Sequence, residues 1–180
     1  MKRIRNILCT LRMLAAVIFL AGSVAANAQF TPMTPPTETD LHASYCSEVI
    51  KNSDIPYYEK ALALLVQQSP AAPNPARDGL VESMQNYLDA SKAALRKLAM
   101  YLAPRVFNNN LDPSALMGAQ VAADDDIRRI ESASSMCSSE CIDSPRASAC
   151  ALECVARKVP DSAVIRNKFQ ACRDLTWLPL

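Results

Sequence analysis

Residues 137–154 read CSSECIDSPRASACALEC and contain two C-x₃-C motifs separated by a short stretch with Asp143 and Pro145. On a helix, a spacing of four residues places both cysteines of a motif on one face, one turn apart. The intervening residues favour a turn, so two antiparallel helices would face each other. In such a hairpin, facing residues have position numbers with a constant sum. Cys137–Cys154 and Cys141–Cys150 share that sum, which predicts a hairpin with two nested disulfides.

Cys46 and Cys172 remain as the third pair, which would join the first helix to the last. Six cysteines follow residue 28, where a secretory signal peptide is expected to end, as argued below. An even number of cysteines in an exported chain is typical of a disulfide framework. A tetrahedral zinc site is the alternative for the four hairpin cysteines, but it normally uses shorter ligand spacings and reduced thiolates. Export favours oxidation instead. We therefore expect a scaffold role for the cysteines, with no metal, cofactor or catalytic residue among them.

The twin C-x₃-C segment resembles the α-helical hairpin proteins with paired C-x₃-C motifs, such as the small mitochondrial inner-membrane chaperones. The resemblance covers residues 137–154 only, and the loop between the motifs is short here. It implies the geometry of the hairpin disulfides and nothing about an activity.

Residues 1–28 have the pattern of a secretory signal peptide. A basic beginning precedes an apolar stretch, residues 13–21, and the small residues Ala26-Asn27-Ala28 form an A-x-A cleavage signature. The alternative is an uncleaved anchor, but a membrane span needs about 20 apolar residues. We therefore expect cleavage after Ala28, a periplasmic or secreted protein, and no membrane span in the mature chain.

The charge and glycine content exclude several functions. Four of the 19 basic residues and none of the 18 acidic residues lie within residues 1–28, so the mature chain carries a net charge of −3. A mildly acidic chain without a basic stripe has no electrostatic means of holding a phosphate backbone, so we expect no nucleic-acid partner. Only Gly79 and Gly118 follow the signal, and no glycine-rich phosphate-binding motif is present.

The rest of the chain predicts an all-α fold. Residues 29–39 contain three prolines and form an extended lead-in, whereas residues 40–180 form a single domain, an irregular bundle of about six helices. A new helix is expected to start at Asp54, with Pro56 in its first turn. The two longest helices, near 80–102 and 113–141, are expected to pack antiparallel. The last helix, from Asp161, is expected to bury Val164, Ile165, Phe169 and Cys172.

Helix 80–102 has the clearest apolar period, with positions 81, 84, 88, 91, 95, 98 and 102 on one face. The seam is short, so we expect it to pack within the chain rather than in an intermolecular coiled coil.

The candidates for chemistry have simpler structural explanations. His42 is the sole histidine, and Asp40 and Ser44, two residues away on either side, cannot face it on a helix. Asp124, Asp125 and Asp126 point in three directions on a helix, so we expect a solvated face rather than a metal site.

The apolar end of the chain has two interpretations. Trp177, Leu178 and Leu180 follow Cys172 closely. The segment either folds back onto the core, which we favour, or forms an exposed patch for a protein partner. Tyr57 and Tyr58 have the same two interpretations, with packing favoured.

Three functional hypotheses follow. The first, which the sequence favours, is an exported, non-enzymatic interaction or structural protein of the cell envelope or the medium. The second is a small apolar ligand-binding or chaperone-like protein, which a cavity above about 300 Å³ would favour. The third is an envelope hydrolase with a dispersed site, which buried acids near His42 would favour. The oligomeric state is not predicted.

Overall fold

The first described helix opens with a capping box at Thr37. The Thr37 side chain accepts a hydrogen bond from the backbone N–H of Asp40, and the Asp40 carboxylate accepts one from the Thr37 N–H at 2.8 Å. These bonds satisfy N–H groups that the first turn of a helix leaves free. Helix α2 (Glu38–Val49) therefore starts two residues before Asp40.

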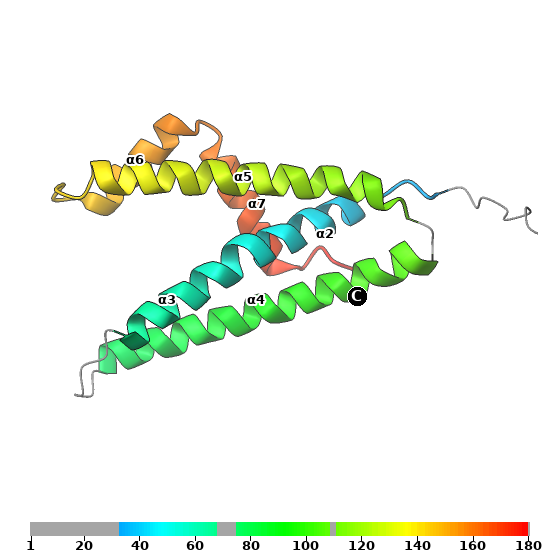
Figure 1. Cartoon of the computed structure of the whole chain (residues 1–180), viewed down its shortest axis with the longest axis horizontal. Helices are drawn as coiled ribbons and strands as arrows, with labels where there is room; N and C mark the ends of the chain where they lie inside the picture. The colour runs from blue at the N-terminus through cyan, green and yellow to red at the C-terminus, as the bar shows by residue number, and fades with distance from the viewer. Residues whose placement is uncertain (1–32, 68–74, 109–110, 180) are drawn as a thin grey trace, which may run out of the picture. The chain divides into compact units, whose positions relative to one another are not determined.

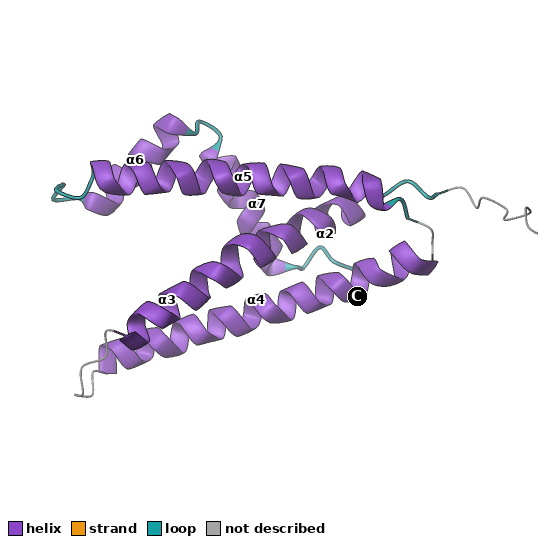
Figure 2. Ribbon diagram, viewed as in Figure 1, coloured by secondary structure: helices purple, strands orange, loops and turns teal. Residues whose placement is uncertain are grey.

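The computed structural model describes residues 33–67, 75–108 and 111–179, which belong to one compact unit, Met33–Leu180 (Figure 1). All regular elements within these residues are helical (Figure 2), apart from one isolated β-bridge between Thr34 and Leu111. This confirms the all-α fold class. Residues 1–28, the expected signal peptide, and residues 29–32 of the expected lead-in lie outside the described residues. After α2 come η1 (Ile50–Asp54), α3 (Ile55–Gln67), α4 (Pro75–Asn108), α5 (Pro113–Glu140), α6 (Ala147–Lys158) and α7 (Ser162–Asp174).

Helices α2 and α3 are joined without a break by η1, a π-helical turn, so the expected helix start at Asp54 is wrong. The N–H of Ile55 bonds to the carbonyl of Ile50, five residues earlier. The wider turn precedes Pro56, which has no N–H and would crowd the carbonyl four residues before it in a regular α-helix. One added residue also rotates α3 by about 100° relative to α2, which changes the face that α3 presents to its neighbours.

Helix α2 lies between the two longest helices, and the expectation that α4 and α5 pack against each other is wrong. The most extensive contacts of α2 are with α5, whereas α4 packs mainly on α3 and makes little contact with α5. The Ser44 hydroxyl donates to the Leu116 carbonyl of α5 at 3.3 Å, and Asp40 on another side of α2 meets α4. Short side chains such as Ala43, fully buried, allow this close approach.

The apolar seam of α4 is used within the chain, as expected. Leu88, Ser91 and Leu98 are buried, and α4 packs on α3, η1 and α2.

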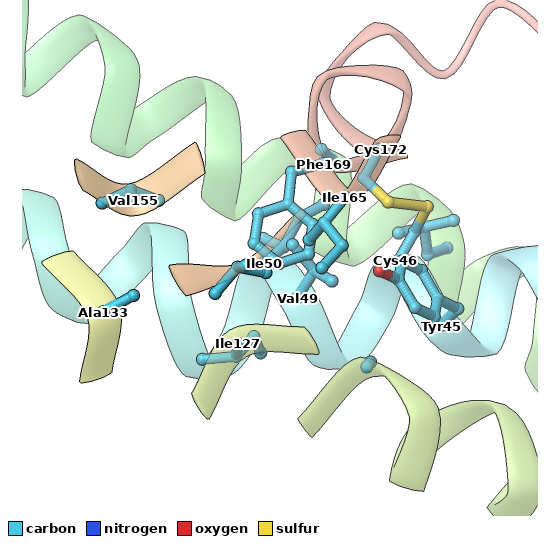
Figure 3. Close-up of a cluster of buried hydrophobic side chains, with 14 of the residues drawn as sticks. Tyr45, Cys46, Val49, Ile50, Ile127, Ala133, Val155, Ile165, Phe169 and Cys172 are labelled. Carbon is cyan, nitrogen blue, oxygen red and sulfur yellow. A yellow bond between two sulfur atoms is a disulfide. The ribbon is translucent and has the colours of Figure 1, made fainter. Parts of the chain in front are cut away.

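The core gathers where α2, α5 and α7 meet (Figure 3). Helix α7 contributes Ser162, Ile165, Phe169 and Cys172, all buried at steps of three and four residues. Val164, expected in this core, is instead 57% exposed, because a position next to Ile165 lies about 100° away around the helix.

The predicted disulfide-stapled hairpin is present. Helices α5 and α6 are joined by Cys137–Cys154 and Cys141–Cys150, whose Cα atoms lie 5.7 and 5.8 Å apart. These distances fall within the range that a disulfide requires. A third disulfide, Cys46–Cys172, joins α2 to α7 with a Cα separation of 5.0 Å, and both of its residues are fully buried. Figure 3 shows this disulfide at the edge of the core.

Candidate ligand-binding site

The hairpin cysteines offer no thiolate to a metal. Side-chain atoms of Cys137, Glu140 and Cys154 approach one another closely enough to hold an ion. However, the two sulfurs are bonded to each other, and a metal-binding cysteine must be a free thiolate. The Glu140 carboxylate lies 3.3 Å from the Cys154 sulfur and is also paired with Lys158 at 2.6 Å. This cluster is therefore a covalent staple with an ion pair beside it.

His42 packs against the end of the chain rather than forming a catalytic pair. Its ring lies 4.2 Å from the Trp177 ring, centroid to centroid, and its Nε2 atom lies 3.8 Å from the Cys46 sulfur. Burial lowers the pKa of His42, so the neutral ring is favoured near neutral pH. The buried acid closest in sequence, Asp40, is engaged with Tyr101 and Arg105 of α4, and its hydrogen bond from Arg105 Nη2 is 2.9 Å long.

The apolar C-terminal segment folds back instead of forming an exposed patch. Leu175 and Leu178 are buried, and Trp177 is half-buried with its indole N–H donating to the Ala171 carbonyl at 3.0 Å. Leu180, the third member of the expected partner patch, lies outside the described residues.

The expectation of a solvated acidic face holds for Asp124 and Asp125 but is wrong for Asp126. Asp126 is only 8% exposed and accepts a hydrogen bond from the Tyr45 hydroxyl at 2.8 Å. Lys168 of α7 adds a contact at 3.4 Å. Burial, followed by the hydrogen bond and charge of Asp126, raises the pKa of Tyr45. The group joins α2, α5 and α7.

A hollow with a volume of about 550 Å³ lies between η1, α3, α4 and α7. Aromatic, aliphatic and a few polar side chains line it, and we call it the tyrosine cavity. Its lining residues are Ile50, Tyr57, Tyr58, Met84, Tyr87, Ala90, Ser91, Ala94, Gln170 and Arg173. This size and this mixture of residues are typical of small-molecule sites.

Three tyrosine rings form one wall of the cavity. The rings of Tyr58 and Tyr87 are stacked with centroids 5.6 Å apart and planes at 11°, and Tyr57 meets Tyr58 edge-on at 5.3 Å. Tyr58 is buried, whereas Tyr57 and Tyr87 are 62% and 56% exposed. The stack is therefore anchored at its inner ring and open at its outer rings. Burial raises the pKa of Tyr58, so its hydroxyl stays protonated at physiological pH.

Arg173 also lines the cavity and is held by a buried carboxylate. Its Nε donates to Asp54 Oδ2 at 2.9 Å and its Nη2 to Asp54 Oδ1 at 2.6 Å. Asp54 is 2% exposed, whereas the Arg173 side chain is 44% exposed. The hydrogen bonds to Asp54 raise the pKa of Arg173, so the guanidinium stays charged. The pair fixes one edge of Arg173 and leaves the rest of the group accessible.

The sequence indicated this site only through Tyr57 and Tyr58. The expectation that both pack against the core holds for Tyr58 but is wrong for Tyr57, which is exposed. Tyr87 and Arg173 are far from Tyr57 and Tyr58 in the sequence. Asp54 has the sequence pattern of a helix start, which gives no indication of its pairing with Arg173. The available signal was compositional: three of the five tyrosines lie in residues 57–87.

Comparison with known proteins gives no match: no family model fits the chain, and no curated protein or solved structure is significantly similar to it. Within the described residues, no helix combines the length and the apolar character needed to cross a lipid bilayer.

Proposed function

We propose that this is an exported helical protein that binds a small, largely apolar molecule in the tyrosine cavity without transforming it. The observation that carries the proposal is the cavity itself, about 550 Å³ in volume and walled by three tyrosines that contact one another. This volume exceeds the roughly 300 Å³ at which pockets begin to accommodate drug-sized ligands. Tyrosine supplies a rigid apolar surface with a polar tip, which suits such a site.

Export is supported by the signal-like pattern of residues 1–28 and by three disulfides. Disulfides persist in oxidising compartments outside the cytosol. A binding role without catalysis is supported by the lining, because the described residues around the cavity include no histidine, cysteine or carboxylate. General acid–base catalysis most often uses such a group, and the tyrosine hydroxyls that line the cavity are weak acids.

The other two hypotheses have less support. A protein partner at the C-terminal patch would need Trp177 and Leu178 to be available, yet Leu178 is 6% exposed. A hydrolase would need an acid that orients His42, yet Asp40 is engaged by Tyr101 and Arg105.

The test is binding of the uncharged fluorophore N-phenyl-1-naphthylamine, whose emission rises in apolar surroundings. The wild-type protein should bind it saturably, and Tyr87→Ala should raise the dissociation constant about tenfold, because stacking and ring area are both lost. Phe107→Ala is the matched control, since Phe107 is an aromatic residue on the same helix and is 81% exposed. Absence of saturable binding, or equal weakening by both substitutions, would show that the cavity is not the site.

A further inference from the structure

We propose that the ligand of the tyrosine cavity is an uncharged molecule with an aromatic ring and a hydrogen-bond acceptor, such as a carbonyl oxygen, that Arg173 binds. The inference rests on the proposed function and adds the chemical class of the ligand. Three features of the cavity carry it: the open tyrosine stack, the unused donors of Arg173 and the charge balance of the walls.

The tyrosine stack selects a flat ring. Tyr58 and Tyr87 already lie nearly parallel, at 11°, with Tyr87 on the exposed side of the pair. Another aromatic ring can extend this arrangement with the offset or edge-on geometry that aromatic pairs favour. An aliphatic ligand would gain contact area but not this orientation-dependent attraction. The exposed ring of Tyr57, edge-on to Tyr58, provides a second aromatic surface in the lining.

Arg173 provides the polar contact. A guanidinium has five N–H donors in a fixed plane, and Asp54 engages only Nε and one hydrogen of Nη2. No other hydrogen bond from this guanidinium is found among the described residues. Three donors therefore remain on a group that lines the cavity. Asp54 also holds the plane of the guanidinium in place, so that a ligand acceptor meets a positioned donor.

The charge balance of the walls favours a neutral acceptor over an anion. Arg173 is the only charged residue among the described lining residues, and the buried Asp54 carboxylate lies directly behind it. A ligand carboxylate would approach a cation that is already neutralised, and would lose its hydration without gaining a second cation. A carbonyl oxygen uses the same N–H donors at a far smaller desolvation cost. The aromatic stack and the donors thus select two chemical features of one neutral ligand: a flat ring and a hydrogen-bond acceptor.

Three probes that share one ring system test the inference by equilibrium dialysis against the purified protein with its disulfides intact. 2-Acetylnaphthalene offers a neutral acceptor, 2-ethylnaphthalene offers the same shape without one, and 2-naphthoate offers an anion. We expect 2-acetylnaphthalene to bind about tenfold more tightly than either of the others. Because the comparison uses only the wild-type protein, its outcome does not depend on whether a variant folds.

Arg173→Lys assigns the preference to the guanidinium. A lysine keeps a positive charge near Asp54 but loses the planar array of donors. The tenfold preference for 2-acetylnaphthalene should therefore disappear, whereas 2-ethylnaphthalene should bind as it does to the wild-type protein. A loss of affinity for all three probes would indicate that Arg173 only maintains the cavity, and would overturn its role as the acceptor-binding group.

The outcomes separate the two proposals. If none of the probes binds, the proposed function fails and the inference fails with it. If 2-ethylnaphthalene binds as tightly as 2-acetylnaphthalene, the cavity binds apolar ligands but the acceptor contact is refuted. If 2-naphthoate binds most tightly, the ligand class is anionic and the assignment of a neutral molecule is overturned.

Discussion

Removing the Cys46–Cys172 disulfide should destabilise the protein more than removing a rung of the α5–α6 hairpin. The first disulfide joins residues with a sequence separation of 126, whereas Cys141–Cys150 spans only 9. In the chain-entropy model, a disulfide stabilises the fold by restricting the unfolded chain, and its effect grows with the logarithm of the loop length. The model assigns about 5 kcal/mol to the long loop and about 3 kcal/mol to the short one.

The difference becomes larger when the other disulfides are taken into account. With Cys137–Cys154 intact, the ends of the Cys141–Cys150 loop are already held close together in the unfolded chain, so the inner rung adds less than about 3 kcal/mol. The hairpin disulfides shorten the path between Cys46 and Cys172 only slightly. The loop that Cys46–Cys172 closes therefore stays long, and its full effect of about 5 kcal/mol remains.

The assay is urea unfolding of two double variants, Cys46→Ala/Cys172→Ala and Cys141→Ala/Cys150→Ala, followed by helical circular dichroism and by Trp177 fluorescence. Alanine preserves helix propensity in both. The first variant should lose about 2 kcal/mol more than the second, and its m-value should rise more, because its unfolded chain expands further. Equal losses, or a larger loss for the hairpin variant, would refute the loop-length argument. If only the first variant fails to fold, the order is the one expected.

Three further predictions concern buried side chains. Burial would raise the pKa of Asp40, but hydrogen bonds to its carboxylate lower it from 3.8 to about 2. Its contribution of about 2 kcal/mol is therefore present above about pH 4 and lost as the pH falls toward 2, a dependence that urea midpoints should show and Asp40→Asn should reduce. Leu98→Ala should cost about 2–5 kcal/mol in urea unfolding, because Leu98 is fully buried. The control on the same helix is Met100→Ala, which should change stability by no more than about 0.5 kcal/mol, since Met100 is 75% exposed. Tyr45→Phe should cost about 1–3 kcal/mol, because the buried Asp126 carboxylate loses a donor; an unchanged melting temperature would contradict this.

The hairpin could be predicted because its information is local. Two spacings of four residues and a short turn determine which cysteines meet, and no distant part of the chain alters that geometry. Once the other four cysteines are paired within the hairpin, Cys46 and Cys172 are the two that remain to form the third disulfide. The start of the helix expected near 113–141 also has a local cause, because the Asp112 side chain accepts a hydrogen bond from the Ser114 N–H in the first turn.

The arrangement of the helices could not be predicted, because it depends on contacts between remote residues. Helix α2 lacks a clear apolar stripe, yet it becomes central because small and polar side chains such as Ala43, Ser44 and Asp40 are buried on different sides of it. Periodicity identifies a helix with one buried face and gives little indication of a helix that is buried on several. Nothing local indicated that Asp126 would find Tyr45, 81 residues away.

The cavity could not be predicted either, because its residues come together only through the π-helical turn and contacts between remote residues. Asp54 and Pro56 resemble a helix start, but the π-turn lets the chain continue through them, and Asp54 pairs with Arg173 instead of capping a helix. The same turn rotates α3, and Tyr57 and Tyr58 reach the cavity on that rotated helix. If residues 40–67 are interpreted as two separate helices, the sequence gives no information about this rotation.

The disulfides constrain the Arg173 part of the cavity lining covalently, but not the tyrosine part. The six disulfide cysteines lie on α2, at α5 and its end, and on α6 and α7; none lies on α3 or α4. Arg173 directly follows Cys172 and is therefore held in place by a covalent bond as well as by Asp54. The tyrosine wall instead depends on packing between α3 and α4 and on the exposed Lys92–Glu59 ion pair, which contributes little. We therefore expect the polar contact to be held by a covalent bond and an ion pair, and the aromatic surface by packing of α3 on α4.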